Sequence, residues 1–150
     1  MNKRLRGISE ICFVLREKVH IKGFWFKRYN RAWQILVAGE CDKIYGDMLE
    51  RAGEEIHQIG NNVTIRFEQM DFGEKGTKSL VICGSTPLEK NTIILKFAKD
   101  GVEEQRMVEF MGTKTKQSFE IEPIYGVNDV SLVFLPGSNF NFTSICFCEA

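Results

Sequence analysis

The chain has 150 residues, 20 basic and 20 acidic side chains, and a hydrophobic share of 43%. This length suits one domain with a sizeable core, so we expect residues 1–150 to form a single domain. The charge balance argues against a dedicated nucleic-acid-binding protein, which would carry a basic excess. No apolar run approaches the roughly 18 residues of a membrane helix. The sequence therefore indicates neither nucleic acid nor a membrane as a partner.

The chain begins with a basic and then apolar stretch, MNKRLRGISEICFVL. Ser9 and Glu10 interrupt the apolar part, charged residues follow it, and no small-residue cleavage site comes after. We therefore expect a strand with a basic leader here and not a signal peptide.

Five cysteines occur, at positions 12, 41, 83, 146 and 148, and none form a CxxC pair. The odd count argues against a disulfide framework and favours reduced thiols in the core. A reducing compartment follows, so we expect a cytoplasmic protein, with secretion as the alternative.

Alternation of apolar and polar residues with a period of two predicts most of the strands. It is clearest in the stretches 63–70, 92–98, 117–123 and 129–136. Shorter apolar runs predict further strands at 11–15, 24–26, 34–38 and 80–83. Turn residues separate these stretches, which is typical of an all-β sandwich or barrel. Residues 46–59 (GDMLERAGEEIHQI) are the one stretch that a helix could claim, and whether a helical turn forms there stays open.

The last predicted strand region changes its alternation. Phe140, Phe142, Ile145 and Phe147 would form its apolar side, which requires an irregularity near residue 143. Two amides, Asn139 and Asn141, lie at its start.

No recognisable catalytic constellation is present. His20 and His57 are far apart in sequence and belong to no zinc motif. Cys12, Cys83 and Cys146 lie within strand patterns, which favours buried structural thiols. Acidic residues are plentiful, but none stand out as a pair for glycosidic acid–base chemistry. The sequence therefore indicates a binding or structural module and not an enzyme.

Several segments resemble known carbohydrate-binding modules. Residues 126–142 (GVNDVSLVFLPGSNFNF) resemble the end of family-6-type modules, residues 70–83 (MDFGEKGTKSLVIC) their apolar-Asp-Phe-Gly element, and residues 38–42 (AGECD) their first strand. A narrower resemblance, over nearly the whole chain, is to the C-terminal jelly-roll module of bacterial family 2 glycoside hydrolases of the β-galactosidase type. It implies a galactose-binding-domain-like jelly roll of two antiparallel sheets. It also implies that the catalytic domains of a bacterial hydrolase are partners of this accessory module.

The resemblance implies a glycan cleft in the loops at one end of the sandwich. Asn139 matches the family's sugar-bonding Asn, although an amide that caps a turn is the alternative. His57 or Gln58 lies where the family has its Tyr, and residues 114–116 lie where it has its Trp. Tyr125 or Phe72 would therefore have to supply a stacking platform from the rim. The candidate glycan-binding residues are Asn139, His57, Asn61, Lys114 and Tyr125. The implied ligand is a galactose- or xylose-containing glycan.

The resemblance also implies a structural calcium ion. Its candidate ligands are Glu40, Asp42 and Asn141, which all offer oxygen donors. Ala38 and Asn141 stand where the family has carboxylates, so the site would carry less negative charge.

A second hypothesis is a structural domain that contacts the hydrolase or helps to build its oligomer. Phe24, Trp25, Phe26 and Trp33 would then form part of an interface patch, with core packing as the alternative. An independent small enzyme is a third and less favoured hypothesis.

Overall fold

The computed structural model describes residues 12–23 and 30–150. Residues 12–23 contain no helix or strand and expose their side chains. The prediction of a strand at 11–15 is therefore wrong for residues 12–15, while residue 11 and the predicted strand at 24–26 lie outside the described residues. No helix in the described part of the chain is long and apolar enough to cross a membrane.

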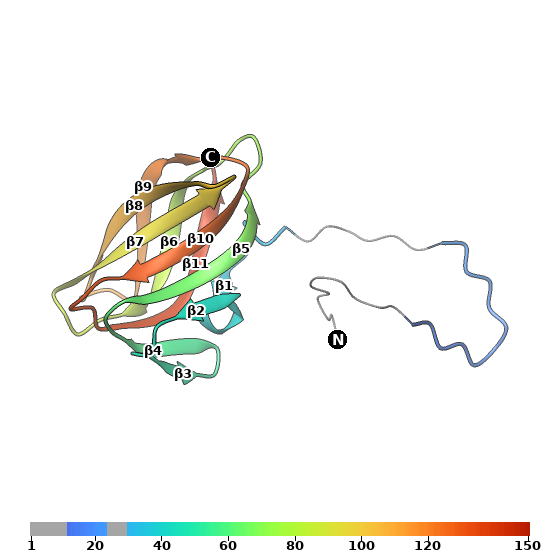
Figure 1. Ribbon diagram of the computed structural model, residues 1–150, viewed down its shortest axis with the longest axis horizontal. Coiled ribbons are helices and arrows are strands. Elements are labelled where there is room, and N and C mark those ends of the chain that lie inside the picture. The colour runs from blue at the N-terminus through green and yellow to red at the C-terminus, as the bar shows by residue number, and fades with distance from the viewer. Residues whose placement is uncertain (1–11, 24–29) are drawn as a thin grey trace.

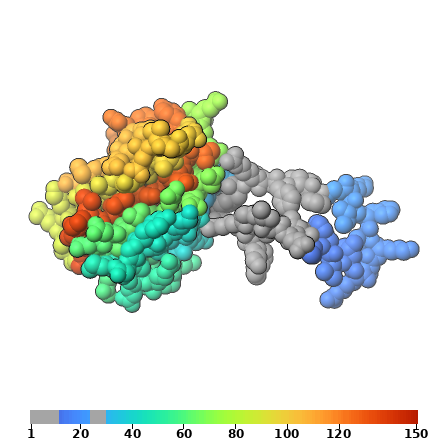
Figure 2. All heavy atoms as spheres, viewed as in Figure 1, coloured from blue at the N-terminus to red at the C-terminus, as the bar shows by residue number. Residues whose placement is uncertain are grey.

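Two antiparallel sheets stack face to face as a β-sandwich (Figure 1), which confirms the predicted fold class. The strands of sheet A are β1 (Leu36–Val37), β3 (Glu50–Ala52), β4 (Glu55–Ile59), β6 (Thr77–Ser85), β9 (Lys116–Ile124) and β11 (Phe140–Glu149). Their order is β3-β4-β11-β6-β9, and β1 also pairs with β11. The strands of sheet B are β2 (Lys43–Tyr45), β5 (Val63–Asp71), β7 (Lys90–Lys99), β8 (Val102–Met111) and β10 (Val127–Phe134). Their order is β2-β5-β10-β7-β8, and parts of this sheet lie side by side as coloured stripes in Figure 2.

The connections between strands gather at the two ends of the sandwich. We call one end the loop pole; it holds the β4–β5, β6–β7, β8–β9 and β10–β11 connections. We call the other end the turn pole; it holds the β5–β6, β7–β8 and β9–β10 connections. In Figure 1 the loop pole is at the lower left and the turn pole at the upper right of the sandwich.

The predicted alternation is confirmed in the core strands. Val63, Ile65 and Phe67 on β5 are buried while their neighbours are half-buried, and β7 and β10 behave in the same way. The irregularity near residue 143 is also confirmed, because the pairing of β11 with β6 shifts between Phe142 and Ser144. Phe142 and Ile145 both face the core although they are three residues apart.

The stretch 46–59 contains a hairpin and no helix. β3 and β4 pair through Glu50 with His57 and through Ala52 with Glu55, and Gly53 turns the chain between them with a φ of 66°. This hairpin forms one edge of sheet A. Its residues Ile56 and Ile59 are buried in the core, while Met48, just before it, is exposed.

Each pole is filled by its own group of aromatic rings. At the turn pole, Phe72 packs edge-on against Trp33, Phe97 and Phe147, with centroid distances of 5.7, 6.3 and 5.1 Å. We call these four rings the turn-pole cluster. The loop-pole cluster comprises Phe110, Phe119, Phe134 and Phe140.

Trp33 therefore serves the core and not an exposed patch. Phe24, Trp25 and Phe26 lie outside the described residues. The expectation of core thiols holds only in part, because Cys41, Cys83 and Cys146 are half-buried while Cys12 and Cys148 are exposed.

Candidate functional site

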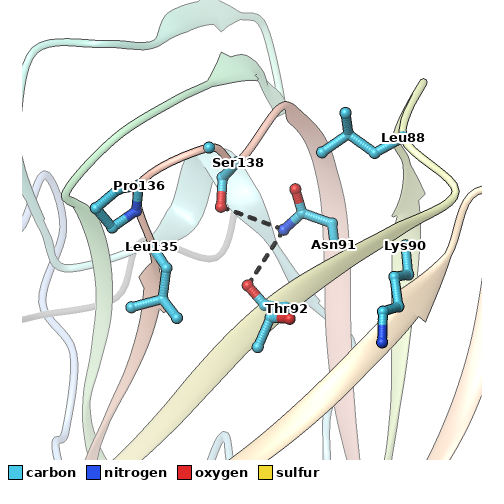
Figure 3. Close-up of a pocket in the computed structure, with 8 residues that line it drawn as sticks. Leu88, Lys90, Asn91, Thr92, Leu135, Pro136 and Ser138 are labelled. Atoms are coloured by element: carbon cyan, nitrogen blue, oxygen red, sulfur yellow. Dashed lines mark hydrogen bonds between the residues drawn. The ribbon is translucent and has the colours of Figure 1, made fainter.

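Buried polar side chains hold the loops of the loop pole in place. Asn91, at the start of β7, is 2% exposed, and its Oδ1 accepts a hydrogen bond from the backbone N–H of Asn139 at 3.0 Å. The Asn91 amide nitrogen points between Ser138 and the backbone of Thr92 (Figure 3). Thr86 donates its hydroxyl to the Asn139 carbonyl at 2.6 Å. The β6–β7 and β10–β11 loops are therefore joined through Asn139.

Two further amides close the remaining loops at this pole. Gln117 clamps Met111, accepting from its N–H and donating to its carbonyl, each at 3.0 Å. Asn61 in the β4–β5 loop accepts a hydrogen bond from the Gly137 N–H at 2.7 Å. All four loops are thus tied to a neighbouring element, so the surface that they form is preorganised.

A small pocket of about 200 Å³ lies between the β6–β7 and β10–β11 loops (Figure 3). It is lined by Leu88, Lys90, Asn91, Thr92, Leu135, Pro136, Gly137 and Ser138. The side-chain amide of Asn91 already bonds to the backbone of Asn139 and lies within hydrogen-bond distance of Ser138 and Thr92. The pocket also has no aromatic ring in its lining, so it offers little for recognition of a sugar.

The predicted glycan residues do not share one cleft. Asn61, Lys114 and Asn139 all lie in loops of the loop pole and are exposed. Asn139 uses its backbone, and not its side chain, in the contacts that hold the loops. Its role in binding glycan stays a prediction.

Neither Tyr125 nor Phe72 lies at the loop pole. Tyr125 follows β9 and lies at the opposite end of the sandwich, because each antiparallel strand reverses the direction of the chain. Phe72 is 1% exposed, in the turn-pole cluster. Neither ring can therefore serve as the stacking platform that the resemblance requires there.

A larger depression lies on the outer face of sheet A beside the loop pole, and we call it the sheet-face groove. Its volume is about 450 Å³. It is lined by Glu55, His57, Cys83, Gly84, Ser85, Thr115, Asn141 and Thr143. Two of the predicted residues, His57 and Asn141, meet here, and Lys114 precedes Thr115 in the adjoining loop.

Hydrogen bonds within β4 and between neighbouring strands position the polar groups of this groove. Glu55 is bonded through its two carboxylate oxygens to His57 Nε2, at 2.7 Å, and to the Thr143 hydroxyl, at 3.2 Å. These bonds, that with His57 first, hold the pKa of Glu55 below its usual value, so Glu55 is ionised at neutral pH. Asn141 Oδ1 accepts from the Gln58 N–H at 2.9 Å, and its amide nitrogen lies 3.4 Å from the Ser85 hydroxyl.

Glycine forms the floor of the groove for a steric reason. A Cβ on Gly84 would come within 2.7 Å of the Phe140 ring, which lies against β6 from the core side. The sequence pattern did not point to Glu55, Ser85 or Thr143. Their outward positions on alternating strands were visible, but which of them become neighbours depends on the order of strands in the sheet.

The candidate calcium ligands do not fit a shared metal site. Arg31, whose side chain is 10% exposed, forms an ion pair of 2.7 Å with Asp42 Oδ2, which also accepts from the Glu68 N–H. A guanidinium at this distance opposes binding of a divalent cation to the same carboxylate. Glu40 ends a short 3₁₀ helix, and Asn141 is bonded to β4 and β6. Within residues 12–23 and 30–150, no group of three or more His, Cys, Asp or Glu side chains is placed to hold a metal ion.

No protein-family model matches the sequence, and no curated protein matches it. Solved structures match the fold. A family 6 carbohydrate-binding module, the subject of a binding sub-site dissection, has a TM-score of 0.68 at 22% identity, covering 79% of this chain and 95% of that chain. CsCBM6-3 from Clostridium stercorarium, in complex with cellobiose, has a TM-score of 0.62 at 24% identity, covering 79% and 95%. A CBM36 module in complex with calcium and xylotriose has a TM-score of 0.57 at 16% identity, covering 77% and 99%.

At these identities the likeness shows the fold. The chain has the β-sandwich of family 6 carbohydrate-binding modules.

Proposed function

We propose that this chain is a non-catalytic carbohydrate-binding module that binds its saccharide in the sheet-face groove. The observation that carries the proposal is the convergence of six polar side chains, from three strands and one loop, around one depression of about 450 Å³. The fold likeness supports the class, since one solved structure of this fold is a complex with cellobiose.

The groove offers the donors and acceptors that neighbouring sugar hydroxyls need. The ionised Glu55 accepts hydrogen bonds, and charge-assisted bonds are the stronger kind. The Asn141 amide and the Thr143 hydroxyl can each donate and accept.

The same composition argues for binding without hydrolysis. Hydrolysis of a glycosidic bond ordinarily requires two carboxyl groups that flank the bond. Among the eight residues that line the groove, Glu55 is the one carboxylate. No Phe, Tyr or Trp ring lines the groove, so we expect weak binding that depends on hydrogen bonds.

The test is isothermal titration calorimetry of the full chain with galactose, cellobiose and xylotriose. Glu55→Gln should weaken binding about tenfold or more, because it removes a charge-assisted acceptor. Glu120→Gln is the matched control, since Glu120 is exposed on β9 of the same sheet and does not line the groove. Equal affinities of the two variants, or no heat with any of the three sugars, would rule out the groove as the site.

We further propose that the module accompanies a bacterial family 2 glycoside hydrolase of the β-galactosidase type and binds a galactose- or xylose-containing glycan in the cytoplasm. The resemblance of the sequence motifs supports this proposal. Mass spectrometry of the polypeptide that carries this sequence, after cell fractionation, tests it. A polypeptide without a catalytic domain and without a bound hydrolase would contradict it.

The alternative function, a structural or oligomerisation domain without sugar affinity, is favoured by one observation. Edge strand β8 exposes Val102 and Met107, by 66% and 68% of their surfaces. Analytical ultracentrifugation of the parent enzyme with Met107→Lys tests this role. Assembly that is unchanged would argue against it.

A further inference from the structure

A second cavity, at the turn pole, has an exposed tyrosine ring and an apolar floor, which the sheet-face groove lacks. It has a volume of about 340 Å³ and opens between β7 and β8 of sheet B and the end of β9 in sheet A. We call it the turn-pole pocket. It is lined by Phe97, Lys99, Asp100, Val102, Glu104, Pro123, Ile124, Tyr125 and Asn128. Its floor is apolar, because Phe97 and Ile124 are buried members of the core.

Tyr125 gives this pocket an exposed aromatic ring. The ring is 51% exposed, and it is backed by Gly76 in the β5–β6 turn. A Cβ on Gly76 would come within 2.6 Å of Tyr125 Cδ1, so a side chain there would displace the ring. Gly76 also has a φ of +76°, and its carbonyl accepts a hydrogen bond from the Ala150 N–H at 3.0 Å. The backing of the ring is therefore held by the fold.

The backbone around Tyr125 is fixed as well. Asn128, which is 5% exposed, donates its side-chain amide to the carbonyls of Tyr125 and Gly126 at 3.0 and 3.2 Å. The Gly126 N–H bonds to the Gly73 carbonyl at 2.9 Å. A ring presented on a rigid turn loses little entropy when a ligand stacks on it.

Charged groups of both signs surround this ring. Lys99, Asp100 and Glu104 come from the β7–β8 hairpin on the opposite wall. The Lys99 side chain reaches across toward Gly126, where its Nζ would lie 2.8 Å from an added Cβ. The pocket thus combines an aromatic face, an apolar floor and a rim of donors and acceptors. A pyranose ring has the matching chemistry, an apolar C–H face and a polar edge.

We propose that the turn-pole pocket is a second saccharide-binding site, in which a pyranose ring stacks on Tyr125 and its hydroxyls bond to Lys99, Asp100 and Glu104. This inference takes its ligand class from the proposed function and so rests on it. It places that ligand at the turn pole. The sheet-face groove lies beside the loop pole, at the opposite end of the sandwich.

The test is a nuclear magnetic resonance titration of the ¹⁵N-labelled full chain with cellobiose, galactose and xylotriose. At least one sugar should shift the amides of Gly101 and Gly126, and Tyr125→Ala should weaken that response tenfold or more. The amides of Gly84 and Thr115 report on the sheet-face groove separately.

Tyr45→Ala is the matched control, because Tyr45 is 50% exposed and lies on β2 at the other edge of sheet B. Tyr125→Phe keeps the ring and should keep the response, which separates loss of stacking from loss of fold. If the Gly101 and Gly126 amides stay in place while the Gly84 amide shifts, the turn-pole site is overturned and the groove stands. The reverse pattern supports the turn-pole site and removes the groove. No shift at either place with any of the three sugars overturns both.

Discussion

The two poles of the sandwich are filled alike and closed differently. Each contains a cluster of four aromatic rings between the sheets. At the loop pole, the side chains of Thr86, Asn91 and Gln117 satisfy the backbone of neighbouring loops. At the turn pole, backbone groups of the β5–β6 and β9–β10 turns bond directly to one another. Ties between loops at the loop pole therefore run mainly through side chains, beside the backbone bond from Gly112 to Glu89. The two turns at the turn pole instead bond backbone to backbone, and the Asn128 amide holds the β9–β10 turn.

Two of the recognisable motifs lie at the turn pole. The Asp-Phe-Gly element and the Gly-Val-Asn-Asp turn both fall at the turn pole, where Phe72 N–H bonds to Gly126 and Gly126 N–H bonds to Gly73. These motifs shape turns and fill the core. The resemblance that they carry is therefore a resemblance of fold, and the polar groups for a ligand come from less distinctive positions.

The largest effect should follow loss of a ring from either cluster. Phe72→Ala and Phe140→Ala should each lower the free energy of unfolding by about 3–5 kcal/mol, because both side chains are fully buried. Urea denaturation measures this loss. Phe72→Leu and Phe140→Leu are milder substitutions. If the two poles are independent, their losses in the free energy of unfolding should add in the double variant. A clear departure from additivity would show that the two clusters are coupled.

Asn91→Ala tests whether the loop pole depends on side chains. It leaves the Asn139 N–H without its partner, so we expect a loss of about 1–3 kcal/mol in the free energy of unfolding. Hydrogen exchange should also quicken at Asn139 and not at Gly126. Unchanged exchange at Asn139 would mean that the loops hold their shape without this amide.

At the turn-pole side, Asp129 should make the stability of the domain sensitive to acid. Partial burial raises the pKa of Asp129, but the hydrogen bond from the Gln69 N–H and the ion pair with Arg66 outweigh it and hold the pKa below its usual value. Stability from this group is therefore present above the pKa of the unfolded chain and lost as pH falls through the lower pKa of the folded chain. Asp129→Asn should remove about 1 kcal/mol at pH 7 and nearly nothing at pH 2. Urea denaturation at both pH values measures this difference, and an equal loss at both would exclude the ionic contribution.

Asn139→Ala should have a much smaller effect than Asn91→Ala. The Asn139 side chain is exposed and its contacts use the backbone, so stability should change by less than about 0.5 kcal/mol. Sugar affinity in calorimetry should also change little if the sheet-face groove is the site. A tenfold loss of affinity would move the site to the loops, as the family resemblance implies.

A chelator should leave the melting temperature of the domain unchanged. Arg31 already compensates Asp42, so calcium is not needed to neutralise that carboxylate. Differential scanning calorimetry with EDTA and with added calcium tests this expectation. A melting temperature that falls with EDTA and recovers with calcium would show a metal site that includes other ligands.

The sequence predicted the positions of the strands better than it predicted which strands lie side by side. Alternation in β5, β7 and β10 identified their buried faces, because one residue in two faces the core in a sandwich. Residues 46–59 were ambiguous because Leu49, Ile56 and Ile59 lie at helical spacings, whereas the span is short and Gly53 disfavours a helix. The place of Tyr125 was out of reach for another reason. It depends on counting the strands correctly, since each additional strand moves a loop to the opposite pole.

The sheet-face groove was likewise hidden in the strand order. Glu55 and Thr143 are 88 positions apart in sequence and meet only because β4 lies beside β11. Arg31 was missed because nothing in the local pattern marks it as a partner of Asp42.

The irregularity in β11 has a consequence for the length of the chain. Phe142 and Ile145 both face the core, whereas a plain strand would need an even number of steps between them. Deleting Thr143 would restore the plain alternation and leave the core side chains of β11 facing inward. It would also remove the hydroxyl that bonds to Glu55. The strand is thus one residue longer than its core requires, and a shorter chain could keep the core while losing part of the groove.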